Sequence, residues 1–261
     1  MIITSNTNNK LKILKSLFDK KNREELGLFL AEGQNTLKEL DPSYILEIFV
    51  AETAYSKIRA EIDAKLADNH KISLFIVSDV IFDKISDTVS PAGLITVCRV
   101  KEPQDISSGN IAVLDRIRDP GNLGTILRSA EALGIKDLIL VDCVDIYNPK
   151  VVRASLGSIF ALNIITCSDS STALKVLEGI DIFALSMSGQ SIYDFTPKSR
   201  IAIVVGNEAS GVSDDFLLAS KGIISIPMAG KMESLNAAVS FSIAVSFLEN
   251  NKGKDFFELF K

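Results

Sequence analysis

The chain has 261 residues, of which 47% are hydrophobic and 23% are charged, and its formal net charge is -5. These values indicate an ordinary globular protein with room for one large domain or two modest ones, and the acidic balance argues against indiscriminate binding to nucleic acid. No apolar run reaches the ~18 residues of a membrane span, and the first residues resemble neither a signal peptide nor a transit peptide, so we expect a cytoplasmic protein without a membrane partner.

The three cysteines are Cys98, Cys143 and Cys167. They are odd in number and widely spaced, and none belongs to a C-x-x-C pair of the kind that binds zinc. We therefore expect reduced core or surface thiols and no metal site.

The first 23 residues concentrate positive charge in this acidic chain. Six basic residues stand against one acid, Asp19: Lys10, Lys12, Lys15, Lys20, Lys21 and Arg23. Apolar residues recur between them at helical spacing: Leu11, Leu14, Leu17 and Phe18. This pattern predicts one amphipathic helix with a basic face. Most such faces are only solvated, but this one is also a candidate surface for contacting phosphates.

Helical and strand-like runs alternate over the first hundred residues. They are LGLFLAEG, NTLKEL, ILEIFVA, a helical stretch over 56–68, SLFIVS, a short helix near 80–85 and LITVCRV. This alternation predicts a small α/β domain. The stretch KEPQDISSGN, over 101–110, lacks periodicity and is the best candidate linker, so we expect domains over 1–103 and 104–261.

The second half of the chain has a different rhythm of compact apolar runs. They are IAVLD (111–115), LILVD (138–142), LNIIT (162–166), DIFALS (181–186), IAIVV (201–205) and GIISI (222–226). Continuous apolar strands with intervening helices are typical of a parallel sheet that is covered on both faces. Ligands of such sheets bind beyond the carboxyl ends of the strands, so the loops there are the candidate site.

The first of these loops, RIRDPGNLGTILRSAEALGI, follows the strand run IAVLD. We expect Asn122 to cap a helix that ends at Gly134. Arg128 lies off the apolar stripe of that helix, where its guanidinium would be accessible to a phosphate. Taken alone, this loop favours the plainer interpretation that Asn122 only caps the helix and that Arg128 is only solvated.

The second loop, GNEASGVS, follows IAIVV. Gly206 and Gly211 would let the main chain approach a ligand closely, and Ser213 is expected to begin the next helix. Neither this loop nor GNLG matches the G-x-G-x-x-G fingerprint, and the chain has no G-K-S/T pair. A nicotinamide dehydrogenase and a P-loop nucleotide hydrolase both lose support.

The third loop is contained in IPMAGKMESLNAAVSFSIAV, over 226–245. Ser234 is expected to cap the helix that follows, and that helix is apolar almost all round, so it must be buried in a core or a subunit interface. Glu233 and Asn236 have no evident structural task. Their polarity is consistent with a structural network or with a ligand.

Together the three loops resemble the motifs of the SpoU or TrmH family of SPOUT RNA methyltransferases. DPGNLGTILRSAEALG is similar to the first motif, GNEASGV to the second and IPMAGKMESLNAAVS to the third, and YNPKVVRASLGSIF is also close to the family pattern. The residues that match the functional positions are Asn122, Arg128, Glu208, Ser234 and Asn236. At Ala209 the family often has glycine, a difference that would bear on cofactor affinity.

The resemblance implies a fold, a reaction and a set of site residues. The fold would be a C-terminal parallel-sheet α/β domain with a deep trefoil knot (SPOUT), in a homodimer. The reaction would transfer a methyl group from S-adenosylmethionine to a ribose 2'-hydroxyl of RNA. The implied catalytic residues are Asn122, Arg128, Glu208, Ser234 and Asn236, and the implied cofactor-binding residues are Ser186, Gly206, Ile226, Met228 and Leu235.

The segment KLKILKSLFDKKNREELGLFLAEGQNTLKEL is similar to the start of the ribosomal-protein-like substrate-binding domain that many family members carry. This resemblance implies a small N-terminal α/β RNA-binding domain. The residues that we expect to contact RNA are Lys10, Lys12, Lys20, Lys21, Arg23 and Arg128. Ribosomal RNA is the preferred substrate and transfer RNA the second choice.

The sequence contains no conventional base for the reaction, since the single histidine, His70, lies in the first domain. A guanidinium gives up its proton reluctantly, so we expect Arg128 to position and stabilise charge, with Asn122 and Glu208 orienting it. Ser234 and Asn236 would shape the acceptor pocket. Two alternatives are a non-catalytic RNA-binding relative and a SPOUT enzyme that methylates a base nitrogen.

Overall fold

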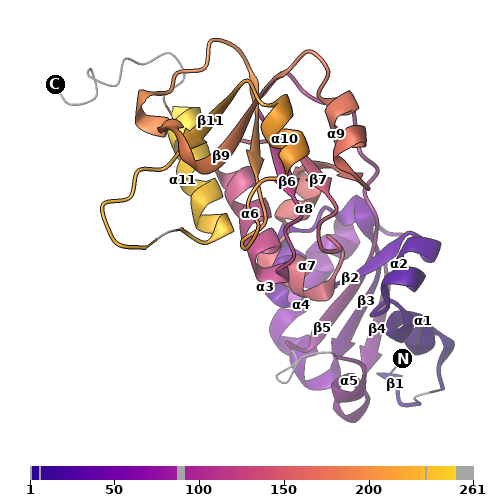
Figure 1. Cartoon of the computed structure of the whole chain (residues 1–261). Coiled ribbons are helices and arrows are strands. Elements are labelled where there is room, and N and C mark those ends of the chain that lie inside the picture. The colour runs from indigo at the N-terminus through magenta and orange to yellow at the C-terminus, as the bar shows by residue number, and fades with distance from the viewer. Residues whose placement is uncertain (1, 6, 87–91, 233, 251–261) are drawn as a thin grey trace. The chain divides into compact units, whose positions relative to one another are not determined.

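The computed structural model describes residues 2–5, 7–86, 92–232 and 234–250. The chain divides into two compact units (Figure 1). The N-terminal unit comprises Met1–Glu102 and Asp145–Phe160, and the C-terminal unit comprises Pro103–Val144 and Ala161–Lys261. The chain therefore passes between the units three times, because residues 145–160 belong by their contacts to the N-terminal unit.

The N-terminal unit contains a mixed sheet with the strand order β1-β4-β3-β5-β2. The strands are β1 (Ile2–Ile3), β2 (Leu28–Glu32), β3 (Ile45–Ala51), β4 (Ser73–Val77) and β5 (Leu94–Arg99). The helices of its first segment are α1 (Asn9–Ser16), α2 (Lys20–Leu26), α3 (Gln34–Glu39), the short η1 (Pro42–Tyr44), α4 (Glu52–Asp68) and α5 (Asp79–Ile85). Strand β3 is parallel to β4 and antiparallel to β5. This arrangement confirms the predicted small α/β unit.

The basic N-terminal segment forms two helices, and the prediction of one continuous helix is wrong. Helix α1 stops where the amide of Leu17 bonds back to the carbonyls of Ile13 and Leu14. The Asp19 side chain then caps α2 by accepting the Lys21 amide at 2.8 Å. Leu17 is nonetheless fully buried, so the apolar spacing did identify the face that packs on the sheet.

Residues 145–160 complete the N-terminal unit with helix α7 (Pro149–Ser155) and the beginning of α8 (Ser158–Ala161). The ring of Phe29 on β2 lies 4.5 Å from that of Tyr147 and 5.7 Å from that of Phe160. Buried Glu32, also on β2, accepts a hydrogen bond from Arg153 at 2.7 Å. Because β2 buries its side chains against this segment, residues 145–160 form part of the core of the unit.

The C-terminal unit is built on a six-stranded, wholly parallel sheet with the order β11-β9-β10-β6-β7-β8. The strands are β6 (Ile111–Asp115), β7 (Asp137–Val141), β8 (Asn163–Cys167), β9 (Asp181–Ser191), β10 (Ile201–Val205) and β11 (Gly222–Ser225). Every strand matches one of the six apolar runs to within a few residues, apart from the longer β9. The two confirmed features, a parallel sheet here and a small α/β unit before it, establish the predicted fold class.

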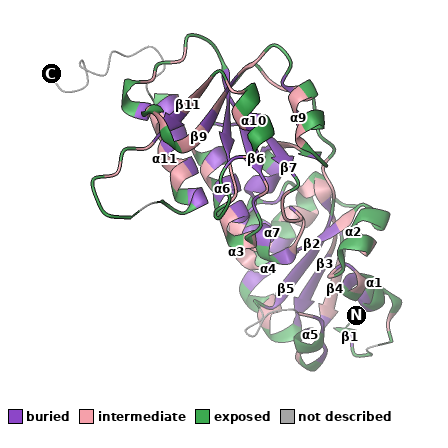
Figure 2. Cartoon of the chain, viewed as in Figure 1, coloured by how far each residue is buried: buried purple, intermediate pink, exposed green. Residues whose placement is uncertain are grey.

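Helices cover both faces of this sheet (Figures 1 and 2). They are α6 (Pro120–Ala132), α9 (Ser170–Val176), α10 (Asp214–Ala219) and α11 (Ala237–Asn250), with the short η2 (Ile192–Asp194). Helices α6 and α11 pack together on one face, and α9 and α10 on the other. All residues of the central strands β6, β7 and β10 are buried as a result.

Helix α11 is the apolar helix expected after the third loop. Phe241, Ala244 and Val245 are buried in it, and Ser242 bonds to Ser129 of α6 at 2.9 Å. Of the helices in the described residues, none has the length and apolar character needed to cross a membrane.

Candidate active site

A cavity of about 310 Å³ lies at the carboxyl edge of the parallel sheet, among the chain segments at β9, β10 and β11. It is lined by Leu185, Ser186, Met187, Val205, Gly206, Asn207, Glu208, Ala209, Gly211, Ile226, Met228, Ser234, Leu235, Ala237 and Ser240. These residues include all five predicted cofactor-binding positions: Ser186, Gly206, Ile226, Met228 and Leu235. The expectation that a site forms where the parallel strands end therefore located the cavity correctly.

The second loop closes on itself at one wall of this cavity. The Asn207 amide donates to the Gly211 carbonyl at 3.0 Å, and the Gly211 amide donates back to Asn207 at 2.8 Å. A Cβ on Gly206 would stand 2.2 Å from the carbonyl carbon of Gly211. Gly206 is thus required by the close approach of the protein's own backbone, whereas the sequence suggested the approach of a ligand.

Helix α6 begins earlier than predicted. The Asp119 side chain caps it by accepting the Asn122 amide at 2.8 Å, and Pro120 occupies the first turn. The prediction that Asn122 is the cap is therefore wrong, although Gly134 does follow the helix end with a positive φ of 86°. Because Asp119 caps the helix, the side chain of Asn122 is available for other contacts.

Asn122 uses that side chain to join all three loops. Its amide nitrogen donates to Glu208 Oε1 at 2.6 Å. Its amide oxygen accepts from Asn236 Nδ2 at 2.8 Å. Three of the five predicted catalytic residues thus form one hydrogen-bonded chain, from Asn236 through Asn122 to Glu208, and the Glu208 end lines the cavity.

Asn236 also caps helix α11. Its side-chain oxygen accepts the amides of Ala238 at 2.9 Å and Val239 at 3.3 Å. The prediction that Ser234 is the cap is wrong, because the helix begins two residues later than that cap requires; Ser234 instead lines the cavity. Glu233, which the sequence also singled out in this loop, lies outside the described residues.

Arg128 differs from the other predicted catalytic residues, because it neither lines the cavity nor belongs to the hydrogen-bonded chain. It is exposed on α6, as its place off the apolar stripe predicted, and it does not line the cavity. Within the described part of the chain, its side chain makes no hydrogen bond or ion pair. The structure therefore does not show the predicted orientation of Arg128 by Asn122 and Glu208, whose side chains bond to each other.

The basic residues of the N-terminal unit differ in how far their side chains are exposed to a possible RNA ligand. Arg23 is only 4% exposed; it donates to the carbonyls of Leu17 and Phe18 and pairs with Asp145. We therefore correct its predicted contact with RNA, because a guanidinium held in this way is not presented to a phosphate. The remaining predicted lysines are exposed: Lys10 pairs with Glu47, Lys20 approaches Glu24 at 3.5 Å, and Lys12 and Lys21 face solvent.

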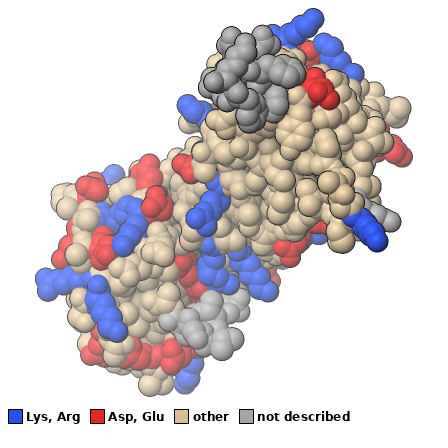
Figure 3. Space-filling model, turned by 90° about the vertical axis from the view of Figure 1, so that its left-hand side faces the viewer, with Lys and Arg blue, Asp and Glu red and all other residues tan. Residues whose placement is uncertain are grey.

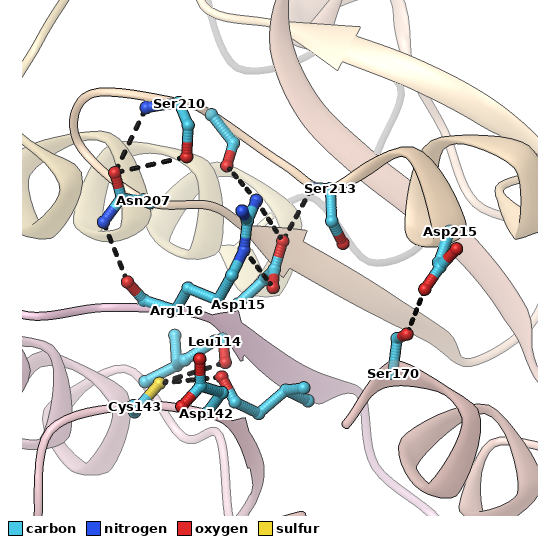
Figure 4. A network of polar contacts seen from close by, with 12 residues as sticks. Leu114, Asp115, Arg116, Asp142, Cys143, Ser170, Asn207, Ser210, Ser213 and Asp215 are labelled. Carbon is cyan, nitrogen blue, oxygen red and sulfur yellow. Dashed lines mark hydrogen bonds and ion pairs between the residues drawn. The ribbon is translucent and has the colours of Figure 1, made fainter. Parts of the chain in front are cut away.

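Sequence reasoning missed the side chains that support the second loop. Asn207 accepts the amide of Ala209 at 2.9 Å. It also accepts the amide of Ser210 at 3.1 Å and donates to the carbonyl of Arg116 at 2.9 Å (Figure 4). Arg116 in turn pairs with Asp115. The available signal was an Asp-Arg pair placed directly after an otherwise apolar strand, where a charge needs a partner.

Cys143 lies near this support and has a weakly acidic thiol. Burial raises the pKa of its thiol to about 12. Its Sγ donates to the Leu114 carbonyl at 3.2 Å (Figure 4). A buried thiol that stays protonated at neutral pH contributes packing rather than chemistry.

Two known protein families match the chain. Residues 109–246 match the SpoU rRNA Methylase family, and residues 8–96 match the MRM3-like substrate binding domain. The first match spans more than half of the chain. The chain belongs to the SpoU rRNA methylase family.

Relatives of this SpoU family member align over two thirds or more of its length. It is 30% identical to the 23S rRNA (guanosine(2553)-2'-O)-methyltransferase RlmP of Bacillus subtilis, over 94% of this chain and 98% of that protein. It is 31% identical to the 23S rRNA (adenosine(1067)-2'-O)-methyltransferase of Streptomyces azureus, over 69% and 71%. The solved structure of an AdoMet-bound rRNA methyltransferase from Sinorhizobium meliloti superposes with a TM-score of 0.80 at 25% identity, covering 95% of this chain and 96% of that one.

Proposed function

We propose that this SpoU family member is an S-adenosylmethionine-dependent RNA methyltransferase that modifies a ribose 2'-hydroxyl of ribosomal RNA. The observation that carries the proposal is the cavity at the carboxyl edge, which is lined by Glu208, one end of the hydrogen-bonded chain from Asn236 through Asn122. The relatives support the substrate, because the Bacillus subtilis and Streptomyces azureus proteins are named as 2'-O-methyltransferases of 23S rRNA.

The cavity fits the proposed cofactor in size and in chemistry. Its volume, about 310 Å³, is at the lower end of the range for small-molecule sites, and residues of the second and third loops form much of its wall. Met187 and Met228 would offer polarizable side chains to the cofactor, and Gly206, Ile226 and Leu235 would offer backbone groups to its adenosine and to the region of its sulfonium. When bound, the cofactor supplies an electrophilic methyl group.

The protein's own residues would position the acceptor. The ribose oxygen would take the methyl group from the sulfonium sulfur, the demethylated thioether would be the leaving group, and the hydroxyl proton would pass to solvent water. Glu208 and Ser234 present polar groups to the cavity, and Asn122 holds Glu208 in place. The exposed guanidinium of Arg128 would bind an RNA phosphate and stabilise charge near the acceptor.

The N-terminal unit would bind the RNA, as its match to a substrate binding domain supports. We propose a substrate-binding domain over 1–103 and a methyltransferase domain over 104–261, with residues 145–160 contributing to the core of the former. Lys12, Lys20 and Lys21 are the proposed phosphate contacts there, since they are exposed. A ribosomal substrate would place the enzyme in the cytoplasm, and transfer RNA is the second candidate.

A homodimer is part of this proposal. An apolar depression of about 620 Å³ lies between α6, α11 and η2, lined by Leu133, Tyr193, Ile243 and Phe247 among others. The side of the C-terminal unit that carries α11 displays few charged residues (Figure 3). A second copy would cover this surface, and sedimentation at micromolar concentration would detect it. The trefoil knot implied by the family stays a prediction.

The proposal is tested by methyl transfer. The purified protein is incubated with labelled S-adenosylmethionine and either unmodified ribosomal RNA or unmodified transfer RNA, followed by nucleoside analysis. We expect label in a 2'-O-methyl nucleoside from ribosomal RNA. Label on a base nitrogen would replace the ribose reaction, and no label together with no cofactor binding by calorimetry would leave an RNA-binding protein without this activity.

A further inference from the structure

Arg116 has an unusual backbone conformation at the end of β6. Its φ is 59°, and in the described residues the other non-glycine positions with positive φ are Asp142 and Leu156. A positive φ is unfavourable for an arginine, because L-residues other than Asn and Asp rarely adopt the left-handed backbone region. Such a backbone conformation persists only where surrounding contacts maintain it, and it is common at ligand-binding sites.

The guanidinium of Arg116 is fixed by a buried carboxylate. Its Nε and Nη2 donate to the two oxygens of Asp115 at 3.0 and 3.3 Å (Figure 4). Asp115 is only 1% exposed and also accepts the Ser213 amide at 2.6 Å. The carboxylate is thus satisfied on both oxygens, and the two-point pairing restricts the direction in which the guanidinium points.

From that position Arg116 holds both ends of the closed loop 207–211. Its Nη2 donates to the Gly211 carbonyl at 3.2 Å. Its own carbonyl accepts Asn207 Nδ2 at 2.9 Å. Asn207 and Gly211 are also the two residues that pair with each other across the loop. One residue therefore supports the loop at both of its closing points, once through its main chain and once through its side chain.

We propose that Arg116 is a positioning residue for the cofactor, holding the 206–211 wall of the cavity in its binding conformation before the cofactor arrives. This inference rests on the proposed function. Gly206, Asn207 and Gly211 all line the cavity, so a loop that moves would remove part of its wall. Fixing the loop in advance lowers the ordering cost of binding. Glu208 is held in the same loop, which links the support to the Asn122 contact.

The variant Arg116→Gly tests this role without straining the backbone. Glycine adopts a positive φ readily, so the backbone at 116 and its carbonyl contact with Asn207 are retained while the guanidinium is lost. Arg118→Ala is the matched control. Arg118 stands two residues further along the same segment and pairs with Asp142, with an Nη1 to Oδ1 distance of 3.2 Å, away from the 207–211 loop.

Calorimetric titration of S-adenosylmethionine into each full-length variant, without RNA, is the deciding measurement. We expect Arg116→Gly to bind the cofactor roughly tenfold more weakly than the unchanged protein, in line with loss of a charged hydrogen bond. Arg118→Ala should bind within about twofold of the unchanged protein, as expected for a surface pair. Because Arg116→Gly leaves the buried Asp115 carboxylate without its charged partner, its unfolding temperature should fall, and the titrations are made well below that temperature. The double variant Asp115→Asn with Arg116→Gly, which removes the unpaired charge, should bind the cofactor as weakly as Arg116→Gly alone, which separates positioning from a loss of stability.

Kinetics and a conservative variant complete the test. In Arg116→Gly the KM for S-adenosylmethionine should rise while the KM for RNA stays unchanged, and Arg116→Lys should recover part of the affinity because one cationic donor remains. Cofactor affinity in Arg116→Gly equal to that of the unchanged protein would overturn the inference alone. Failure of the unchanged protein to bind the cofactor would overturn the proposed function and this inference with it.

Discussion

The basic segment over 10–23 and the carboxyl edge of the C-terminal sheet are both candidate sites in the sequence. They differ in the contacts that their polar side chains make in the structure. In the basic segment, Arg23 is buried in an ion pair with Asp145, and Lys10 pairs with Glu47. At the sheet edge, polar residues that are far apart in sequence meet directly, as Asn122 and Glu208 do at 2.6 Å.

The difference lies in what brings the residues together. A run of charges along the chain carries no information about which side chains a later segment will cover. The ends of neighbouring parallel strands, in contrast, must lie at one edge of a sheet, so polar residues that follow them converge. A strand-end pattern is therefore a better guide to a site than a count of local charge.

The largest expected effect concerns the buried ion pair of the basic segment, which we expect to stabilise the fold. Arg23→Ala should lower the free energy of unfolding by about 3 kcal/mol, because it leaves the largely buried Asp145 carboxylate without its partner. Thermal and urea unfolding measure the change. The double variant with Asp145→Asn should lose less than the sum of the two single losses; additive losses would show that the pair is not coupled.

The next prediction concerns the proposed role of Arg128 in methyl transfer. We expect Arg128→Ala to slow methyl transfer by about 100-fold, as for removal of one charge-stabilising group, with its unfolding temperature unchanged because the side chain is exposed. Labelled methyl transfer measures the rate. The matched control is Arg200→Ala, an exposed arginine just before the amino end of β10; full turnover in Arg128→Ala would refute the proposed role.

A smaller effect is expected from the exposed lysines of the basic segment. Lys12→Ala and Lys21→Ala should each weaken RNA binding a few-fold and lower the slope of log affinity against log salt by about one, without changing stability. Binding titrations at several salt concentrations measure this. Lys175→Ala, on α9 of the other unit, is the comparison, and an equal loss there would remove the assignment to the basic segment.

The smallest effect is an absence of reaction at two thiols, that of buried Cys98 in the N-terminal unit and that of partly buried Cys143 in the C-terminal unit. Burial raises the pKa of Cys98 well above its usual range and that of Cys143 to about 12. At pH 8 both stay protonated, and the thiolate of Cys143 forms only as pH rises toward 12. Iodoacetamide should therefore label neither in the native protein and both after denaturation, as mass spectrometry of digests would detect. Rapid native labelling of either would show that its unit opens.

Particular residues show where sequence reasoning reached its limit. The apolar runs predicted β6 and β10 to the residue, since fully buried strands allow few polar positions. The caps were misassigned at Asn122 and Ser234, because several polar residues near a helix start can serve and only the backbone decides which one does. The contribution of residues 145–160 to the N-terminal unit was not foreseen, because Glu32 and Arg153 are far apart in sequence.

The sequence by itself determined the fold class through apolar periodicity and the family through short motifs at strand ends, and the family resemblance implied five of the positions that line the cavity. Only the tertiary structure decided that Arg23 is buried, that Asn122 joins Asn236 to Glu208, and that Arg116 supports the second loop. Each of these is a contact or burial between segments distant along the chain. Its energy depends on burial and direction, which neither composition nor spacing encodes.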